Sequence, residues 1–266
     1  KISVGVDNEQ QVLALSEAFK NEKESVQVFI EVEVGEERSG IVPGNQVVQL
    51  ASFIQSISNV KLKGIFSHEG HTYSASTQEE CAEMFRQSQQ DTLYAAKLIR
   101  DAGIKVEVVS IGATPSILIG KILPGITEIR PGTYILMDAA QGHAIQNYHH
   151  CAATVLATVV SKPTSERIVL DTGTKALTYF TRSHGICYTP GYGMVKNFNG
   201  LRINRLFDEH GLISDRAANK KLSLGDKVEI IPNHICPTCN LYDKMYLVKK
   251  GKFFQELPIL CRGKSQ

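Results

Sequence analysis

The feature that most constrains the fold is a regular alternation of strand-like and helical segments across the first half of the chain. The strand-like runs are 1–7, 26–35, 60–70, 105–116 and 127–138. The segments between them with apolar residues at helical spacing are 8–22, 45–57 and 76–102, and a short helix follows residue 116. Strands that alternate with helices form βα units and a parallel sheet. The first half therefore predicts an α/β unit.

The rhythm changes in the second half of the chain, where no convincing helical pattern appears. Its strand-like runs, separated by Gly, Pro, Asn and Asp, are 152–163, 167–173, 200–211, 226–234 and 244–254. Short strands bounded by such turn residues are typical of antiparallel sheets. We expect an α/β unit over residues 1–148 and a mostly antiparallel β domain over residues 149–266.

The number of strands bears on the architecture of the first half. Five βα strands are too few for a closed (β/α)8 barrel, so an open doubly wound sheet is the default interpretation. However, the chain begins abruptly on a strand that looks central, and three further βα units of about 30 residues each would complete eight. An incomplete (β/α)8 barrel, from about strand 4 to strand 8, is the alternative.

Composition excludes several classes of protein. The formal net charge of +2 gives no basic excess of the kind that a nucleic-acid-binding protein carries. No apolar run approaches the roughly 20 residues that span a bilayer, so no membrane segment is expected. The six cysteines are scattered apart from one close pair, which suits reduced thiols and a cytoplasmic location better than a disulfide framework.

Polar clusters follow three of the predicted strands, where barrel-type sheets place their functional groups. "SHEGHTY" (67–73) supplies His68, His71 and Tyr73, although both histidines could equally be structural. "SIGATPS" (110–116) leads into a helix and could cradle a phosphate with its backbone N–H groups, or serve only as a capped turn. The third cluster, "RPGTYILMD", contains Gly132 and Tyr134.

A fourth cluster, "IPNHICPTCN" (231–240), lies in the predicted β domain. If the backbone is extended, the side chains of His234 and Cys236 point to the same side, as two ligands of one Zn²⁺ would. Cys239 completes a CxxC pair, but a structural zinc site needs four ligands and no second CxxC exists. A metal pair, buried structural cysteines and a redox pair all remain open on spacing alone.

Taken together, several segments resemble one family, the pyridoxal-phosphate enzymes grouped as D-threonine aldolase and eukaryotic-type D-serine dehydratase. The matching segments, in family order, are "VFIEVEVGEERSGI" (28–41), "SHEGHTY" (67–73), "SIGATPS" (110–116), "EIRPGTYILMD" (128–138), "LDTGTKALT" (170–178), "LFDEHG" (206–211) and "IPNHICPTCN" (231–240). The resemblance implies an alanine-racemase-like (β/α)8 barrel followed by a β domain.

The resemblance also implies roles for residues at the matching positions. The cofactor phosphate would be held by Gly112, Ala113, Thr114, Gly132 and Tyr134. The pyridoxal ring and its substrate adduct would be lined by Arg38, His68 and Tyr73. His234 and Cys236 would bind a divalent metal, commonly Zn²⁺ but alternatively Mn²⁺ or Mg²⁺, with Cys239 a bystander. The expected substrates are small D-3-hydroxy amino acids, and a homodimer is expected.

In this family the metal acts on the β-hydroxyl of the substrate, which either leaves as water or is stabilised while the Cα–Cβ bond breaks. These outcomes correspond to D-serine dehydration and D-threonine cleavage. An amino-acid racemase is the alternative enzyme, although racemisation offers no β-hydroxyl for a metal to activate. The family's Schiff-base lysine lies in an HVKT-like segment with no counterpart here, and Lys175 belongs to the β domain. We therefore expect an N-terminally truncated form, and an inactive remnant is a further alternative.

Overall fold

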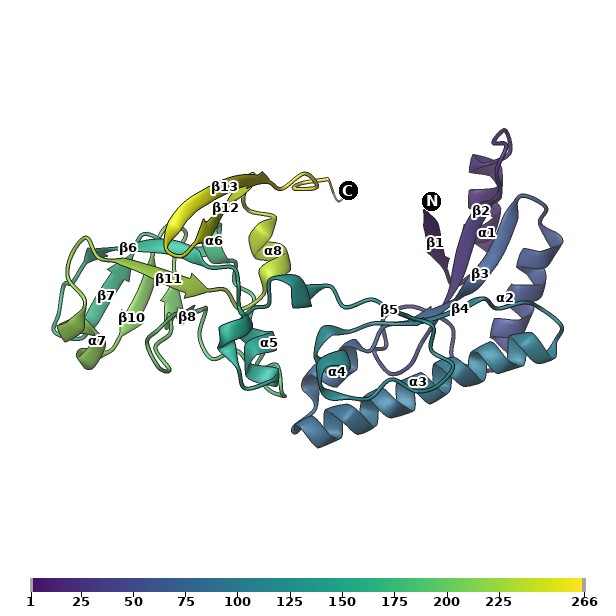
Figure 1. The fold of residues 1–266 in the computed structure, drawn as a ribbon, viewed down its shortest axis with the longest axis horizontal. Helices are drawn as coiled ribbons and strands as arrows, with labels where there is room; N and C mark the ends of the chain where they lie inside the picture. Colours follow the sequence, from purple (N-terminus) through teal and green to yellow (C-terminus); the bar gives the residue numbers. More distant parts are fainter. Residues whose placement is uncertain (1, 265–266) are drawn as a thin grey trace. The chain divides into compact units, whose positions relative to one another are not determined.

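The computed structural model describes residues 2–264, which form two compact units (Figure 1). The units divide between Gly132 and Thr133. That division lies earlier than the boundary at 148/149 predicted from the sequence. Met137 and Ala139 pack with Cys151 and Ile231 in one apolar cluster, and this places residues 137–151 with the second unit.

The first unit is built on a five-stranded parallel sheet whose strands are hydrogen-bonded in chain order. The strands are β1 (Ser3–Val6), β2 (Val26–Val32), β3 (Val60–Ser67), β4 (Val108–Ile111) and β5 (Glu128–Ile129). Parallel neighbours in chain order are what successive βα units of a barrel wall produce. All carboxyl ends of the strands therefore meet at one edge of the sheet.

The helices of the first unit are α1 (Glu9–Ala18), α2 (Asn45–Ser56), α3 (Gln78–Asp101) and α4 (Thr114–Ile119), and a 3-10 helix, η1 (Gly70–Ser74), follows β3. Side-chain caps start two of the helices. Asn8 accepts a hydrogen bond from the amide of Gln11, and Thr77 accepts one from Glu80. Each cap satisfies an amide that has no partner within the helix.

The core of the first unit lies between the sheet and its helices. Strand residues such as Ile30 and Ile65 pack with helix residues such as Ile54 and Ile99, and all four are fully buried. Each such side chain contributes about 1.5–3 kcal/mol of transfer free energy. In Figure 1 α2 and α3 lie along the same side of the sheet.

The prediction of alternating strands and helices is confirmed for the first four strands, but the fifth is much shorter than predicted. Only Glu128 and Ile129 of the expected run 127–138 form a strand. Pro131 has no N–H to donate to a ladder, and a 3-10 helix, η2 (Thr133–Ile135), follows soon after it.

The second unit contains a six-stranded antiparallel sheet, and this confirms the antiparallel character predicted from the sequence. The strand order is β8-β11-β6-β7-β10-β9. Its strands are β6 (Val155–Ser161), β7 (Arg167–Leu170), β8 (Met194–Val195), β9 (Arg205–Leu206), β10 (Gly211–Ser214) and β11 (Lys227–Ile231). The core of the sheet contains the fully buried Ile168, Leu170, Ile203, Ile213 and Ile230.

Short helices also occur in the second unit, where the sequence showed no convincing helical pattern. They are α5 (Ala139–Ala144), α6 (Thr174–Leu177), α7 (Arg216–Lys221) and α8 (Ile235–Cys239), and a 3-10 helix, η3 (Tyr148–His150), precedes β6. Helices of four to six residues are too short to show a periodic apolar pattern. Two of them carry an aspartate at the N-cap, Asp138 and Asp215.

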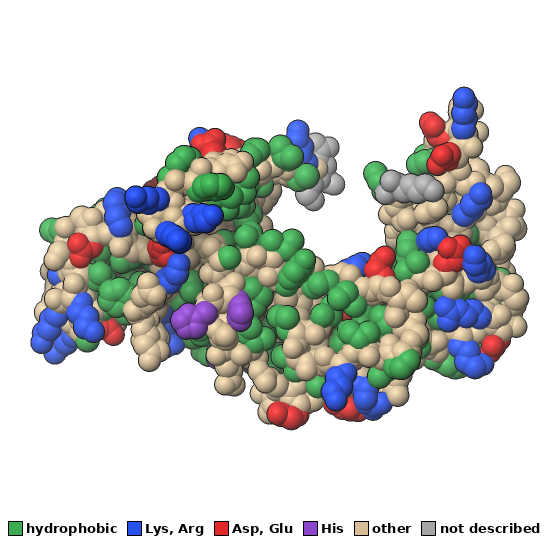
Figure 2. Space-filling model, in the orientation of Figure 1, with side chains coloured by type: hydrophobic (Ala, Val, Ile, Leu, Met, Phe, Trp, Pro, Cys, Tyr) green, Lys and Arg blue, Asp and Glu red, His purple; other side chains and the backbone are tan. Residues whose placement is uncertain are grey.

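The last two strands, β12 (Lys244–Lys249) and β13 (Lys252–Pro258), form a separate antiparallel hairpin. Tyr246, Val248, Phe253 and Phe254 of this hairpin are exposed. Figure 2 shows green hydrophobic side chains on the surface where Figure 1 draws β12 and β13. No helix within residues 2–264 has the length and apolar character needed to cross a lipid bilayer.

Candidate functional site

Two of the predicted polar clusters meet at the carboxyl edge of the parallel sheet. His68 follows the end of β3, and Gly112 follows the end of β4. The Nδ1 atom of His68 is hydrogen-bonded to the carbonyl oxygen of Gly112. The structure therefore brings together the "SHEGHTY" and "SIGATPS" segments, 44 positions apart in the chain.

The ring of His68 is held on both nitrogen atoms. Because a carbonyl oxygen only accepts hydrogen bonds, Nδ1 carries a proton when it bonds to Gly112. On the other side, Nε2 lies 3.5 Å from Oε2 of Glu36. The ring of Tyr73, in η1, is nearly perpendicular to the ring of His68, and the two ring centroids are 6.5 Å apart. His68 is 27% exposed, so a ligand at the sheet edge could reach it.

Arg38 is linked to His68 through Glu36, which contacts both side chains. The Nη1 atom of the exposed Arg38 lies 3.3 Å from Oε1 of Glu36, and Oε2 of Glu36 accepts a hydrogen bond of 3.1 Å from the amide of Gly70. Glu36 thus joins the loop after β2 to the loop after β3. The sequence analysis did not single out Glu36, whose place in the acidic run "GEER" gave no sign of this role.

Glycine is required at position 112 because the backbone there lies close to that of Arg130. A Cβ atom at this position would lie 2.8 Å from both the Cβ and the carbonyl oxygen of Arg130. Only glycine fits so close to a neighbouring main chain. Ala113 and Thr114 are buried beside it. This tight turn is consistent with a backbone cradle for a phosphate.

The turn is supported by Glu69, a residue that the sequence analysis passed over. Its carboxylate is fully buried and accepts a hydrogen bond of 2.9 Å from the amide of Gly112 and one of 2.7 Å from the hydroxyl of Ser67. Burial raises the pKa of Glu69 to about 7, against the opposing effects of Ser67 and of the Arg130 guanidinium. Its burial identifies it as a candidate, and a sequence does not show burial.

The second histidine of "SHEGHTY" has a different environment. The Nε2 atom of His71 lies 3.3 Å from the hydroxyl of Ser88 on α3, and burial lowers the pKa of the imidazole. An added Cβ on Gly35 would contact the ring, so His71 packs against the loop after β2. These contacts favour a structural role for His71.

Gly132 and Tyr134, predicted as cofactor-binding residues, are both exposed. Open space surrounds the position where a side chain on Gly132 would project. Tyr134 lies in η2 and is 52% exposed. Their assignment to the cofactor phosphate rests on the resemblance alone.

Lys175 lies in α6 and forms an ion pair with Glu209, and both side chains are exposed. This hydrogen bond with Glu209 raises the pKa of the amine. A cofactor-binding lysine needs a lowered pKa or a neighbouring base to act as a nucleophile. The environment of Lys175 therefore agrees with its exclusion as the cofactor lysine.

In the second unit, His234 is fixed by a buried carboxylate. Its Nδ1 atom lies 3.2 Å from Oδ2 of Asp138, whose side chain is fully buried. The same Oδ2 accepts the amide of Ile235, and Oδ1 accepts the amide of Gln141. Asp138 thereby joins the start of α5 to the start of α8. It had not been singled out, because it lies 96 positions before His234 in the chain.

The backbone around His234 differs from the extended geometry assumed from the sequence. His234 itself is extended and forms the N-cap of α8, but Cys236 lies within the helix. The first turn of α8 therefore places the thiol, and the extended backbone predicted for His234 and Cys236 is wrong at Cys236. Cys236 is exposed at the surface, yet partial desolvation raises the pKa of its thiol, and so does the nearby Asp138, while a hydrogen bond with Thr133 opposes both.

The hydrogen bond between His234 and Asp138 is one that a metal-binding histidine usually has. An imidazole whose Nδ1–H bonds to a carboxylate keeps its Nε2 lone pair available, which is the usual arrangement of a metal-binding histidine. Within residues 2–264, no three or more His, Cys, Asp and Glu side chains are grouped so that they could hold a metal ion.

Comparison with known proteins covers both units. Residues 1–140 match the family model described as alanine racemase, N-terminal domain, and residues 152–248 match the one described as putative serine dehydratase domain. The predicted boundary at 148/149 falls in the interval between the two matched regions. These matches agree with the predicted sequence of a barrel portion and a β domain.

Individual relatives extend the match over the chain. A D-threonine aldolase from an Arthrobacter species is 30% identical over 273 residues, which cover 100% of this chain and 69% of the relative. A D-serine dehydratase from Dictyostelium discoideum is 28% identical, over 93% of this chain and 68% of the relative. The crystal structure of D-threonine aldolase from Filomicrobium marinum superimposes with a TM-score of 0.85 at 26% identity, covering 100% of this chain and 71% of the other. The predicted alanine-racemase-like architecture is thereby confirmed.

Proposed function

Because the chain belongs to the pyridoxal-phosphate-dependent family of D-threonine aldolase and D-serine dehydratase, we propose that it acts as a metal-assisted lyase on D-3-hydroxy amino acids. The family members named above cleave or dehydrate D-amino acids that carry a β-hydroxyl, as their names state. The observation that carries the metal part of the proposal is the hydrogen bond between Asp138 and His234, two positions before Cys236.

The residues proposed to hold the cofactor are those that line the carboxyl edge of the parallel sheet. The 112–114 turn would hold the phosphate, with Gly132 and Tyr134 contributing from the next segment, and Arg38, His68 and Tyr73 would line the ring. Pyridoxal phosphate supplies an electron sink for negative charge that develops at the substrate α-carbon. The fit is supported by Gly112, where an added Cβ would lie 2.8 Å from Arg130, so that only glycine permits this tight turn.

His68 would act within this site as a fixed proton carrier or donor. Its Nδ1 proton is committed to the Gly112 carbonyl, so only Nε2 can exchange a proton with a ligand. Glu36 lies on the Nε2 side of the ring, with its Oε2 atom 3.5 Å from that nitrogen. The Tyr73 ring limits the movement of the imidazole from the side.

His234 and Cys236 are the residues proposed to bind a divalent metal, with zinc the first choice for an imidazole and a thiolate. A metal ion there would supply a Lewis acid for the β-hydroxyl of the substrate. Asp138 would keep His234 in the tautomer that presents Nε2, because its carboxylate accepts the Nδ1 proton. Cys236 would have to lose its proton on metal binding, and metal coordination favours the thiolate.

The test of the proposal is to assay D-threonine and D-serine with the protein supplied with pyridoxal phosphate and zinc. Cleavage of D-threonine would give glycine and acetaldehyde, and dehydration of D-serine would give pyruvate and ammonia. Release of either pair supports the lyase and identifies its reaction. Formation of only the L-enantiomer would support a racemase, and turnover of neither substrate would contradict the proposal.

A second test separates the role of the metal from that of the cofactor. We expect His234→Ala to lower lyase turnover far more than it lowers cofactor affinity. An equal loss of both would contradict a role at the β-hydroxyl. The homodimer and the cytoplasmic location stay predictions, and light scattering at several protein concentrations tests the first.

A further inference from the structure

Glu69 lies at the centre of a buried polar network beneath the 112–114 turn. Its Oε1 accepts the hydroxyl of Ser67, and Oε2 accepts the amide of Gly112. The hydroxyl of Thr92, on α3, lies 2.8 Å from that of Ser67. The guanidinium of Arg130 donates to the carbonyl of Ser67 and to the hydroxyl of Ser110. The network therefore joins the ends of β3, β4 and β5 to α3.

The hydrogen bond between Gly112 and Glu69 determines which backbone N–H groups of the turn can bind an anion. A backbone amide has one proton to donate, and that of Gly112 is committed to Glu69. Glu69 thus fixes the turn, and Gly112 would contribute to a phosphate site through its lack of a side chain and not through its amide proton. A negative charge there would oppose the binding of a phosphate in front of the turn, because like charges repel strongly where water is excluded.

The charged and titratable groups around Glu69 come from each neighbouring element. Arg130 follows β5 and is the nearby cation, and its own pKa is lowered by burial. His68 and Glu36 lie on the rim, where His68 bonds to the carbonyl of Gly112. Glu128, on β5, accepts the hydroxyl of Ser110, and His71 contacts Ser88 on α3. Arg130 is shared among the acidic groups, so it does not fully offset a charge on Glu69.

The network tolerates either charge state of the carboxyl group. When Glu69 is ionised, Ser67 donates to Oε1, as the 2.7 Å distance permits. When Glu69 is protonated, its O–H can donate to Ser67 instead, because a hydroxyl rotates and also accepts. The bond from the Gly112 amide to Oε2 persists in both states. Glu69 can therefore gain or lose its carboxyl proton while the turn at Gly112 keeps its structure.

Resting on the proposed function, in which this turn binds the cofactor phosphate, we propose that Glu69 is a positioning residue whose proton is taken up when the phosphate binds. The neutral carboxyl holds the Gly112 amide in place without repelling the anion. Burial supports this assignment, since it raises the pKa of Glu69 to about 7 in the absence of a ligand. A phosphate nearby would raise that pKa further.

The consequence is a pH dependence of phosphate affinity. Above pH 7, binding must be accompanied by uptake of one proton, so affinity falls by up to about tenfold for each unit of pH. Glu69→Gln carries no charge at any pH and keeps one acceptor oxygen for the Gly112 amide. That variant should bind more tightly than the wild type at pH 8 and should lose this pH dependence.

The experiment titrates the whole chain with pyridoxine 5′-phosphate, which has no aldehyde and so does not react with lysines. Binding is followed by ligand fluorescence between pH 6 and pH 8.5, for the wild type, Glu69→Gln and the control Glu128→Gln. Titration of the ligand itself is common to all three proteins and cancels. We expect the wild type and Glu128→Gln to share one profile and Glu69→Gln to be flat relative to them. Equal profiles for all three would overturn the inference, whereas no binding by the wild type at any pH would overturn the proposed phosphate site.

A second measurement needs no ligand. The amide proton of Gly112 should show an NMR shift that titrates with a midpoint near pH 7 in the wild type and not in Glu69→Gln. In Ser67→Ala the midpoint should move to higher pH, because Ser67 stabilises the ionised form. An invariant Gly112 shift in the wild type, or an unchanged midpoint in Ser67→Ala, would overturn the assignment even if Glu69→Gln folded poorly.

Discussion

The Nδ1 atom of His234 lies 3.2 Å from Oδ2 of Asp138, a fully buried carboxylate at the start of another helix. This contact fixes the imidazole with Nε2 directed away from its support. It gives a histidine that sequence spacing alone left ambiguous the carboxylate support that metal-binding histidines usually have. The same carboxylate also accepts the amides that begin α5 and α8, so its position is set by the backbone.

The first prediction concerns this carboxylate. Asp138→Asn keeps the size of the side chain and an acceptor for one of the amides, but removes the charge that stabilises the Nδ1 proton. We expect zinc affinity to fall by about 10- to 100-fold, as for other carboxylates behind a metal-binding histidine. Competition with a fluorescent zinc chelator measures the effect. An unchanged affinity in a folded variant would show that Asp138 is only a helix cap.

The second prediction concerns the tight approach at Gly112. Gly112→Ala places a Cβ 2.8 Å from Arg130, so the backbone must shift. We expect the free energy of unfolding to fall by about 1–3 kcal/mol, the usual cost of overpacking. Gly132→Ala is the matched control for stability, since a Cβ there meets open space. Urea denaturation compares the two, and equal midpoints would contradict the steric argument.

The third prediction follows from the pKa of Glu69, which is raised to about 7 in the folded chain from an ordinary value of 4.5. Between these values the folded state binds more protons than the unfolded state, so stability falls as pH rises from 4.5 to 7 and then levels off. The full loss is about 3 kcal/mol above pH 7. Glu69→Gln should remove it, making the variant more stable than the wild type at pH 8 but not at pH 4.5. Denaturant unfolding at several pH values measures the difference, and parallel curves would refute the prediction.

The sheet of the first unit could be predicted from sequence because its first three strands, β1, β2 and β3, are each followed by a helix long enough to show its period. The 24-residue α3 is the clearest case. The short helix α8 could not be predicted in this way, because five residues contain too little of the pattern. As a result, the relation between His234 and Cys236 was assigned to an extended strand when it belongs to a helix start.

The candidate site was only partly visible in the sequence for a related reason. His68 and Gly112 could be selected because they follow predicted strands, and parallel strands end at one edge. Asp138 and Glu69 act through contacts with segments 96 and 43 positions away, which no local pattern reveals. Both are carboxylates that a sequence shows as ordinary surface residues until burial identifies them.

The fourth prediction separates the two thiols of the CxxC pair. Cys236→Ser should lose most of the zinc affinity, whereas Cys239→Ser should retain it, because the Cys236 thiol is near Asp138, the carboxylate that bonds to His234. Both substitutions replace sulfur by oxygen with little change in volume, so each serves as a control for the other. Isothermal titration with zinc at fixed pH measures both. Equal losses would make Cys239 a third ligand.

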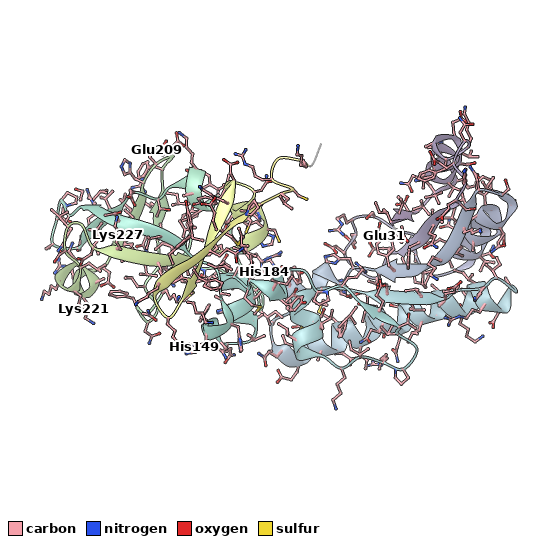
Figure 3. The ribbon with its side chains drawn as sticks, turned by 45° about the horizontal axis from the view of Figure 1, so that its top comes forward. Glu31, His149, His184, Glu209, Lys221 and Lys227 are labelled. Atoms are coloured by element: carbon pink, nitrogen blue, oxygen red, sulfur yellow. The ribbon has the colours of Figure 1, made fainter. Side chains whose placement is uncertain are left out.

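The most direct test of the central claim is the zinc content of the chain after equilibrium dialysis against a buffered zinc solution, for the wild type, His234→Ala and His149→Ala. His149 is an exposed histidine in η3, labelled in Figure 3, and serves as the control. We predict one zinc ion per chain in the wild type and in His149→Ala, and none in His234→Ala. Zinc bound equally by all three proteins, or absent from the wild type, would contradict the account.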